Sequence, residues 1–177
     1  MKLILISAAL AAFAAPAAAS PGVDVFKTVC GETHADFTAV KAALAAPGWT
    51  ATEAEQNPLP GVTPTEGIAR RRVEGDSQIT VNAWTGTKGT YLLTACTVKV
   101  TKISVEAAVK DTQAWVGFAP ESTAGDKTTW RYGETGGTRE ALQQPAYETA
   151  AGGTGLFFLN VFADNGAAVI DLLKIKS

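Results

Sequence analysis

The sequence is poor in the residues on which most metal and nucleophilic chemistry depends. It contains one histidine, two cysteines and one methionine among 177 residues. A structural zinc site takes four ligands, and the only histidine, His34, has just Cys30 and Asp36 as potential ligands close to it in the chain. We therefore expect no metal site and no cofactor, and we expect His34 to be a surface residue in the first turn of a helix.

Motifs for nucleophilic catalysis and for phosphate binding are also missing. The sequence has no Gly-Xaa-Ser-Xaa-Gly elbow, and any catalytic triad would have to use His34. Gly152, Gly153 and Gly155 precede a predicted strand instead of a helix, so their amides would not form a phosphate cradle at a helix N-terminus. We interpret this glycine-rich stretch as a flexible loop.

Two pairs of neighbouring carboxylates could in principle serve a hydrolase, because glycoside hydrolysis needs only two such groups. Glu53 with Glu55 and Glu74 with Asp76 are these pairs. All four residues lie in polar turns, where carboxylates are normally solvated, so we expect no acid–base pair among them.

The charge balance is weak, and long apolar runs are rare. The sequence has 15 basic and 17 acidic residues, a formal net charge of −2, and removal of Lys2 with the leader would change this to −3. Nucleic-acid binding calls for a basic face, so we exclude it. Beyond the N-terminal leader no apolar run reaches the roughly 20 residues that a membrane helix needs.

The first 19 residues have the composition of a cleavable export signal. Lys2 supplies a positive start, residues 3–15 are mostly apolar, and Pro16 precedes a run of alanines. An Ala-Xaa-Ala pattern ends this segment, so we place cleavage between Ala19 and Ser20. The alternative, a membrane anchor or buried helix, fits the short alanine-rich run and the proline less well. We expect a mature domain of residues 20–177 in the periplasm or secreted.

The two cysteines are expected to form a disulfide. Cys30 precedes the first predicted helix and Cys96 lies in a predicted strand. Cysteines of exported proteins usually pair, and closing so long a loop stabilises the fold by about 4 kcal/mol. Two free thiols, or one reactive thiol, are the alternative.

Hydrophobic periodicity predicts an α+β fold. Helices are expected at 34–46, where Thr33 and Asp36 resemble a capping box, and after Ser104 up to Gly117. Predicted strands, besides a short one entered through Arg70–Arg72, are 78–84, 90–100, 128–132, 155–163 and 167–176. We predict a twisted antiparallel sheet of about five to seven strands with the two amphipathic helices on one face. The similar order of elements in 34–100 and 104–176 suggests an α-β-β-β pseudo-repeat.

The last two predicted strands carry a polar pair on an apolar face. Asn165-Gly166 is the preferred two-residue hairpin turn, and this turn places Asn160 directly opposite Asp171. Both strands are apolar on both sides, so we place them centrally in the sheet. A carboxylate in that setting is costly unless it is hydrogen-bonded or protonated. It is either the polar anchor of a pocket or a satisfied structural pair.

A second candidate site combines aromatic and arginine side chains beside a long loop. Trp130, Arg131 and Tyr132 precede the 133–154 segment, which contains Tyr147. Such residues next to loops are typical of binding surfaces. Plain core packing of the aromatic residues is the alternative.

Arg70 and Arg72 share one face of a predicted strand and could bind an anion such as a carboxylate or a lipid phosphate. Nearby acidic residues would cancel much of their field. The alternative is a solvated edge strand whose charges discourage aggregation.

These observations favour a non-catalytic binding or interaction module of the cell envelope over an enzyme. The expected partner is another envelope protein, a peptide or a small ligand. A small secreted hydrolase that uses carboxylates and a structural or assembly protein are the alternatives.

Overall fold

A computed structural model describes residues 20–54 and 59–177 of the chain. The predicted leader and Glu55 lie outside the described residues. Among the described residues, no helix combines the length and the apolar character that crossing a membrane would require.

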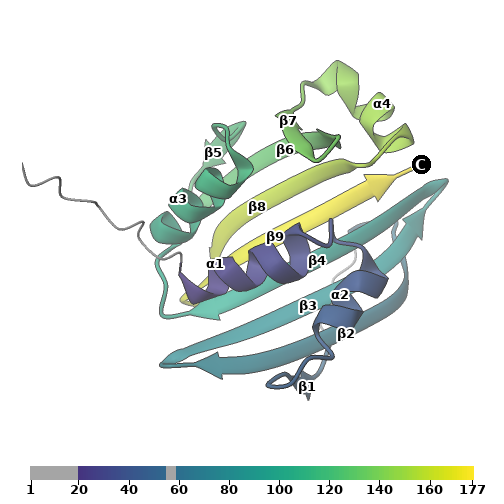
Figure 1. Ribbon diagram of the computed structural model, residues 1–177. Helices are drawn as coiled ribbons and strands as arrows, with labels where there is room; N and C mark the ends of the chain where they lie inside the picture. The colour runs from purple at the N-terminus through teal and green to yellow at the C-terminus, as the bar shows by residue number, and fades with distance from the viewer. Residues whose placement is uncertain (1–19, 55–58) are drawn as a thin grey trace, which may run out of the picture.

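All strands of the described residues join one antiparallel sheet (Figure 1). The strands are β1 (Thr50–Thr52), β2 (Thr63–Glu74), β3 (Ser77–Lys88), β4 (Tyr91–Thr101), β5 (Ser122–Ala124), β6 (Lys127–Thr135), β7 (Thr138–Ala141), β8 (Leu156–Asp164) and β9 (Ala167–Lys176). Their order is β1-β2-β3-β4-β9-β8-β6-β5, and β7 also pairs with β6. The sheet is not a closed barrel, and the broad prediction of an antiparallel α+β fold is confirmed.

The sheet has nine strands where five to seven were predicted. Six strands are long, and the additional ones, β1, β5 and β7, have only three or four residues each. Strands this short, with mostly exposed residues, show no alternation of apolar and polar positions that a sequence could reveal. Strand β2 is also longer than expected, so the three arginines lie inside it and not at its entrance.

The two central strands β8 and β9 have the predicted turn and register. Asn165 and Gly166 both have positive φ angles, 50° and 76°, as a two-residue hairpin turn of this kind requires. Asn160 pairs with Asp171 across the hairpin, as predicted. The pairing of β4 with β9 joins the two halves of the chain. On one side of this pair the strands follow in the order β4-β3-β2, and on the other side in the order β9-β8-β6, so that each half places its last strand at the centre of the sheet.

The helices are α1 (Pro21–Val25), the π-helical η1 (Phe26–Gly31), α2 (Phe37–Ala43), α3 (Val105–Val116), the short η2 (Gln144–Ala146) and α4 (Tyr147–Gly152). Helix α3 agrees with the prediction: Ser104 caps it by accepting a hydrogen bond from the Ala107 amide, and Gly117 ends it with φ 93°.

Helix α2 is shorter than the predicted helix 34–46. Its N-cap is Asp36, which accepts a bond from the Ala39 amide. Thr33 is not a cap, because its hydroxyl donates to the carbonyls of Val29 and Cys30 at the end of η1. Sequence spacing identified a cap within a few residues but not the correct one.

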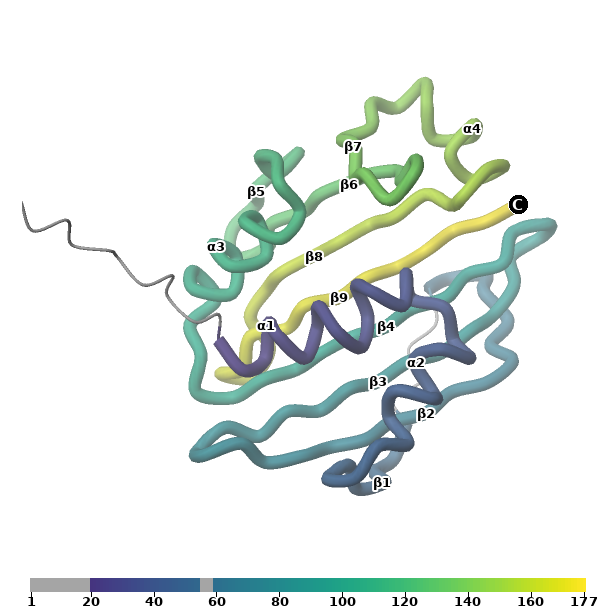
Figure 2. Tube along the Cα trace, in the orientation of Figure 1, coloured from purple at the N-terminus to yellow at the C-terminus, as the bar shows by residue number. Residues whose placement is uncertain are grey.

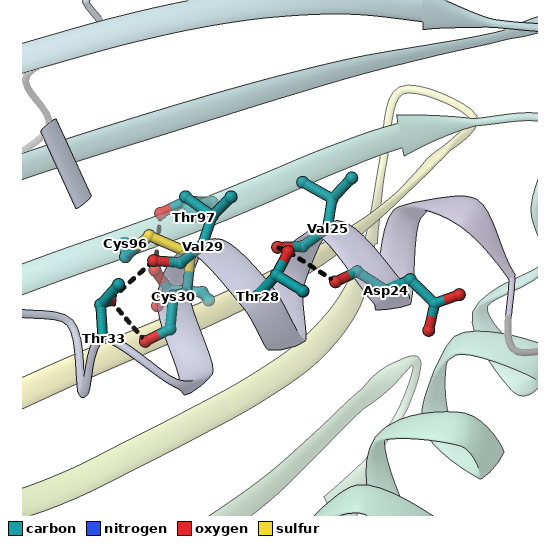
Figure 3. The surroundings of a disulfide bond; sticks show 9 residues. Asp24, Val25, Thr28, Val29, Cys30, Thr33, Cys96 and Thr97 are labelled. Atoms are coloured by element: carbon teal, nitrogen blue, oxygen red, sulfur yellow. Dashed lines mark hydrogen bonds between the residues drawn. A yellow bond between two sulfur atoms is a disulfide. The ribbon is translucent and has the colours of Figure 1, made fainter. Parts of the chain in front are cut away.

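Elements α1 and η1 follow directly on one another and were not predicted. Ser20 and Pro21 begin the segment, as proline favours the first turn of a helix. Cys30 lies in its last turn, and its sulfur is bonded to that of Cys96 on β4 (Figure 3). The predicted disulfide is therefore present, with Cα atoms 5.5 Å apart.

The long strands have two different faces. The face that we call the covered face contributes to one core cluster with side chains of α1, η1, α2 and α3. The backbone of these helices lies in front of the sheet in the ribbon of Figure 1 and in the Cα tube of Figure 2. Its fully buried members include Ile79, Val98, Trp130, Leu159 and Leu172. Side chains at the alternate positions, such as Thr97 and Asp171, lie on the opposite side, which we call the open face.

Candidate functional site

A line of polar side chains crosses four strands on the open face. Thr97 on β4 donates its hydroxyl hydrogen to Asp171 Oδ1 on β9, with the two oxygens 2.8 Å apart. Asn160 Nδ2 on β8 donates to Asp171 Oδ2 at 3.5 Å, and Thr129 Oγ1 on β6 donates to Asn160 Oδ1 at 3.0 Å. We call these four residues the polar ladder.

The carboxylate of Asp171 is the charged member of this ladder. Desolvation by burial raises its pKa above the ordinary value of 3.8, while the bonds from Thr97 and Asn160 and the charge of Lys127 oppose the rise. The donors therefore hold in place a carboxylate that its surroundings disfavour in the ionised form. Burial of a carboxylate costs folding free energy, which is unusual for a residue with a purely structural role.

An arginine and two aromatic rings lie on the same face beside the ladder. The Arg131 NH1 group donates to Glu121 Oε1 at 2.6 Å and to the Tyr147 hydroxyl at 3.0 Å. Its guanidinium lies 5.5 Å from the ring centre of Tyr147 and 5.3 Å from that of Phe158. The hydrogen bond that Arg131 donates to the Tyr147 hydroxyl is the main cause that raises the pKa of Arg131. We call Glu121, Arg131, Tyr147 and Phe158 the arginine cluster.

A lysine also lies over a second aromatic ring of the open face, and another lysine is paired nearby. The ammonium of Lys127 lies 6.0 Å from the ring centre of Phe162. Lys99, next to the ladder, pairs with Asp164 at 2.6 Å. Charged groups thus cover part of this face, and α4 packs over the ends of β8 and β9 on the same side.

An apolar pocket of about 210 Å³ adjoins the arginine cluster. Tyr147 belongs to both. Its hydroxyl accepts a hydrogen bond from Arg131 and donates one to Glu121, and Tyr147 also lines the pocket. The other lining residues come from β3, β4, α4, β8 and β9: Lys88, Tyr91, Leu93, Glu148, Ala151, Leu156 and Ile175. We call this cavity the α4 pocket.

The structure divides the predicted aromatic surface between the two faces. Trp130 and Tyr132 are 0% and 1% exposed and belong to the core on the covered face. Arg131, between them, points to the open face and meets Tyr147 there. Side chains alternate along a strand, so three consecutive residues of β6 could not share one exposed surface, and the core alternative applies to Trp130 and Tyr132.

The predicted anion site at Arg70 and Arg72 is separate from these groups. Both belong to β2, at the other side of the sheet. Arg72 forms an ion pair with Glu74, and its guanidinium lies 4.7 Å from the ring centre of Trp49. Arg70 donates to the carbonyl of Ala69 at 3.0 Å. The local partners of Arg72 resemble those of a charged edge more than those of an open anion site.

Of the four carboxylates that the acid–base alternative named, the structure describes Glu53, Glu74 and Asp76 but not Glu55. Glu74 is engaged by Arg72, whereas Glu53 and Asp76 are exposed. Their surroundings are those of solvated carboxylates.

A network around one buried carboxylate was missed entirely. His34 Nδ1 contacts the carboxylate of Glu134, and Arg139 Nε lies 3.2 Å from the same carboxylate. The Arg139 guanidinium lies 3.7 Å from the ring centre of Trp115 and also donates to its carbonyl oxygen. His34 is therefore not in the first turn of a helix: it precedes the N-cap by two residues, with φ 53°.

This network connects the segment after η1 with β6, β7 and α3. No local pattern could have predicted it, because the partners are far apart in the sequence. In the described part of the chain, no group of three or more histidine, cysteine, aspartate and glutamate side chains is arranged to hold a metal ion.

A groove of about 1,090 Å³ lies between α3 and the β5–β6 hairpin. It contains none of the predicted site residues, and its rim carries both signs of charge through Glu106, Lys110 and Asp126. Its lining therefore does not favour any one class of partner.

The open face is consequently the place where separately predicted groups meet. It holds Asn160 and Asp171, Arg131 and Tyr147, and the α4 pocket. No known protein family, curated protein or solved structure matches the chain, so the functional argument rests on this geometry.

Proposed function

We propose that the protein is a non-catalytic binding module of the cell envelope that holds a partner protein on its open face. One observation carries this proposal: the polar ladder, the arginine cluster and the α4 pocket adjoin one another on that face. A desolvated carboxylate, an arginine over aromatic rings and an apolar cavity together offer hydrogen bonds, charge and an anchor position.

The location in the envelope is supported by the disulfide and by the predicted leader. The Cys30–Cys96 bond is fully buried in the core, and such bonds persist in oxidising compartments. Export to the periplasm or beyond would supply that environment.

A partner can reach the open face only if the two predicted helices, α2 and α3, both pack on the opposite face of the sheet. Helix α2 contacts β3 and β4, whereas α3 contacts β8 and β9. Both helices contribute to the same core cluster. This supports the predicted arrangement of two helices on one face, and the mirrored strand order of the halves supports the predicted pseudo-repeat.

The size of the α4 pocket favours a protein partner over a free small ligand. Pockets for small molecules usually have volumes of roughly 300–1,000 Å³, and this pocket has about 210 Å³. That is room for one large apolar side chain. Tyrosine and arginine are enriched where such anchors dock; Tyr147 lines the pocket, and Arg131 donates to its hydroxyl. The proposed partner therefore inserts one apolar side chain beside Tyr147.

The role of Asp171 in this proposal is that of a polar anchor. Its direct partners are a hydroxyl and an amide, which fix the position of the carboxylate. A partner would satisfy the remaining hydrogen-bonding capacity of the ladder instead of being hydrolysed by it.

The first two residues of β4 provide a matched test. Tyr91 and Leu92 are 40% and 47% exposed, but only Tyr91 lines the α4 pocket. A photoreactive benzoylphenylalanine would be placed at either position and the exported protein irradiated in cells. We expect a covalent adduct from position 91 whose mapped partner peptide carries an apolar side chain at the cross-link, and at least tenfold less of it from position 92.

The variant Tyr147→Ala completes the experiment. It removes the ring shared by the pocket and the arginine cluster, and we expect it to abolish the adduct at position 91 while thermal unfolding shows a folded protein. Equal adducts at both positions, or an unchanged adduct in the folded Tyr147→Ala variant, would contradict the proposal. A mapped adduct with a small molecule would contradict the choice of a protein partner.

A further inference from the structure

The first helical segment is fastened at both ends by contacts to distant parts of the chain. At its C-terminal end, Cys30 is bonded to Cys96. At its N-terminal end, the backbone nitrogen of Ser20 lies 3.1 Å from Asp111 Oδ2 on α3, a residue 91 positions away. Ser20 is itself part-buried, so the start of the segment is packed against the protein, unlike the frayed ends of most domains.

We propose that removal of the leader converts the Ser20–Asp111 contact into an ion pair, so that the protein gains an N-terminal fastening only when it is processed. Cleavage adds water across the Ala19–Ser20 peptide bond, catalysed by an endopeptidase of the export route. Ala19 leaves with the new carboxylate, and the Ser20 nitrogen takes up a proton to become an ammonium group. The neutral amide donor that faces Asp111 in the precursor is thereby replaced by a positive charge.

Asp111 is well placed to be the counter-ion of the new terminus. It lies on the side of α3 that meets α1, since these two helices are in contact. The other charged groups nearby on the two helices are engaged or directed elsewhere. Asp24 and Lys27 pair with each other along the first helix at 3.6 Å, and Lys110 lines the groove on the outer side of α3.

The consequence concerns the order of events after export. Both fastenings of the first helical segment depend on chemistry completed outside the cytoplasm, namely leader removal at one end and thiol oxidation at the other. The precursor would therefore hold this segment less tightly than the mature protein does. A group that pairs with an anion in the folded state stabilises the fold below its ordinary pKa, roughly 8 for an α-amino group, and this stabilisation is lost as the pH rises above it.

The test is a cycle of four proteins of residues 20–177: the mature chain with a free Ser20 terminus, the same chain with an acetylated terminus, and the Asp111→Asn variant of each. At pH 6 we expect acetylation to lower the melting temperature of the wild-type chain by about 2–4 °C. In the Asp111→Asn chain, acetylation should change the melting temperature by less than about 1 °C. At pH 10 the difference between free and acetylated wild-type chains should vanish.

Asp24→Asn is the matched control, because it removes a carboxylate that pairs with Lys27 and leaves the backbone bond from the Asp24 amide to the Ser20 carbonyl in place. Acetylation should retain its full effect in this variant. Equal effects of acetylation with and without Asp111, or an effect that persists unchanged at pH 10, would overturn the proposal. The comparison of free and acetylated wild-type chains decides the pH result even if Asp111→Asn does not fold.

Discussion

Two adjacent phenylalanines of β8 show how differently the two faces of the sheet are built. Phe157 is 1% exposed on the covered face and stacks on Tyr132, with ring centres 5.0 Å apart. Phe158, one residue further, is part-exposed on the open face beneath the guanidinium of Arg131. The same contrast separates Cys96, which is bonded inside the core, from Thr97, which donates to Asp171. Helices α1, α2 and α3 contribute to the core on one face, whereas cations, hydroxyl groups and α4 cover parts of the other.

The largest effect should come from removing the disulfide of the covered face. The double variant Cys30→Ala/Cys96→Ala should lose about 4 kcal/mol of unfolding free energy, because the bond closes a loop over a sequence separation of 66 residues. Urea denaturation would measure the loss. The reduced wild-type protein serves as control and should approach the same value; a loss below about 1 kcal/mol would show that the helices hold the covered face without the bond.

The two phenylalanines provide the most direct comparison of the faces. Phe157→Ala should cost about 3–4 kcal/mol, since it leaves a cavity among packed core residues. Phe158→Ala should cost about 1–2 kcal/mol, because a part-exposed site loses less buried area and relaxes more readily. Chemical denaturation of both variants would test this, and equal costs would mean that the open face is covered as tightly as the other.

Removing one hydroxyl of the polar ladder should have a smaller effect. Thr97→Val keeps the shape of the side chain but takes a donor from the Asp171 carboxylate, at a cost of about 1–2 kcal/mol at pH 7. Thr97→Ser, which retains the hydroxyl, is the matched control and should lose less. In an Asp171→Asn background the Thr97→Val cost should shrink, and a cost independent of Asp171 would show that the bond contributes little.

The subtlest prediction concerns pH. Burial raises the pKa of Asp171, so the folded state binds its proton more tightly than the unfolded state does. Its stabilising contribution is complete below the ordinary value of 3.8 and is lost as the pH rises through the folded pKa. The wild-type protein should therefore lose stability relative to Asp171→Asn as the pH rises above the ordinary value of 3.8. If the wild-type protein instead gained stability relative to Asp171→Asn as the pH rises, desolvation could not be the main influence on the pKa of Asp171.

Local patterns predicted the parts of the fold in which neighbouring residues determine structure. Ser104 and Gly117 delimited α3, and the Asn165-Gly166 turn determined which residues of β8 and β9 face each other. The pairing of Asn160 with Asp171 could be counted directly from that turn. The two cysteines were paired by exclusion, because the sequence offers no others.

Contacts between distant segments could not be predicted in this way. The pairing of β4 with β9 brings Thr97 to Asp171 and completes the ladder, yet it joins strands from opposite halves of the chain. The His34–Glu134 pair likewise depends on tertiary structure alone. Trp130 and Arg131 were grouped because they are adjacent, whereas alternation along β6 sends them to opposite faces.

The cations that lie over exposed rings also influence which molecules the open face can meet. Lys127 over Phe162 and Arg131 over Phe158 place positive charge above its apolar side chains. In a symmetric dimer formed through this face, the lysine and arginine side chains of one copy would lie close to those of the other copy. Like charges at short distance repel. If the proposed partner binds here, the same cations would favour acidic residues around its apolar anchor over a second copy of this chain.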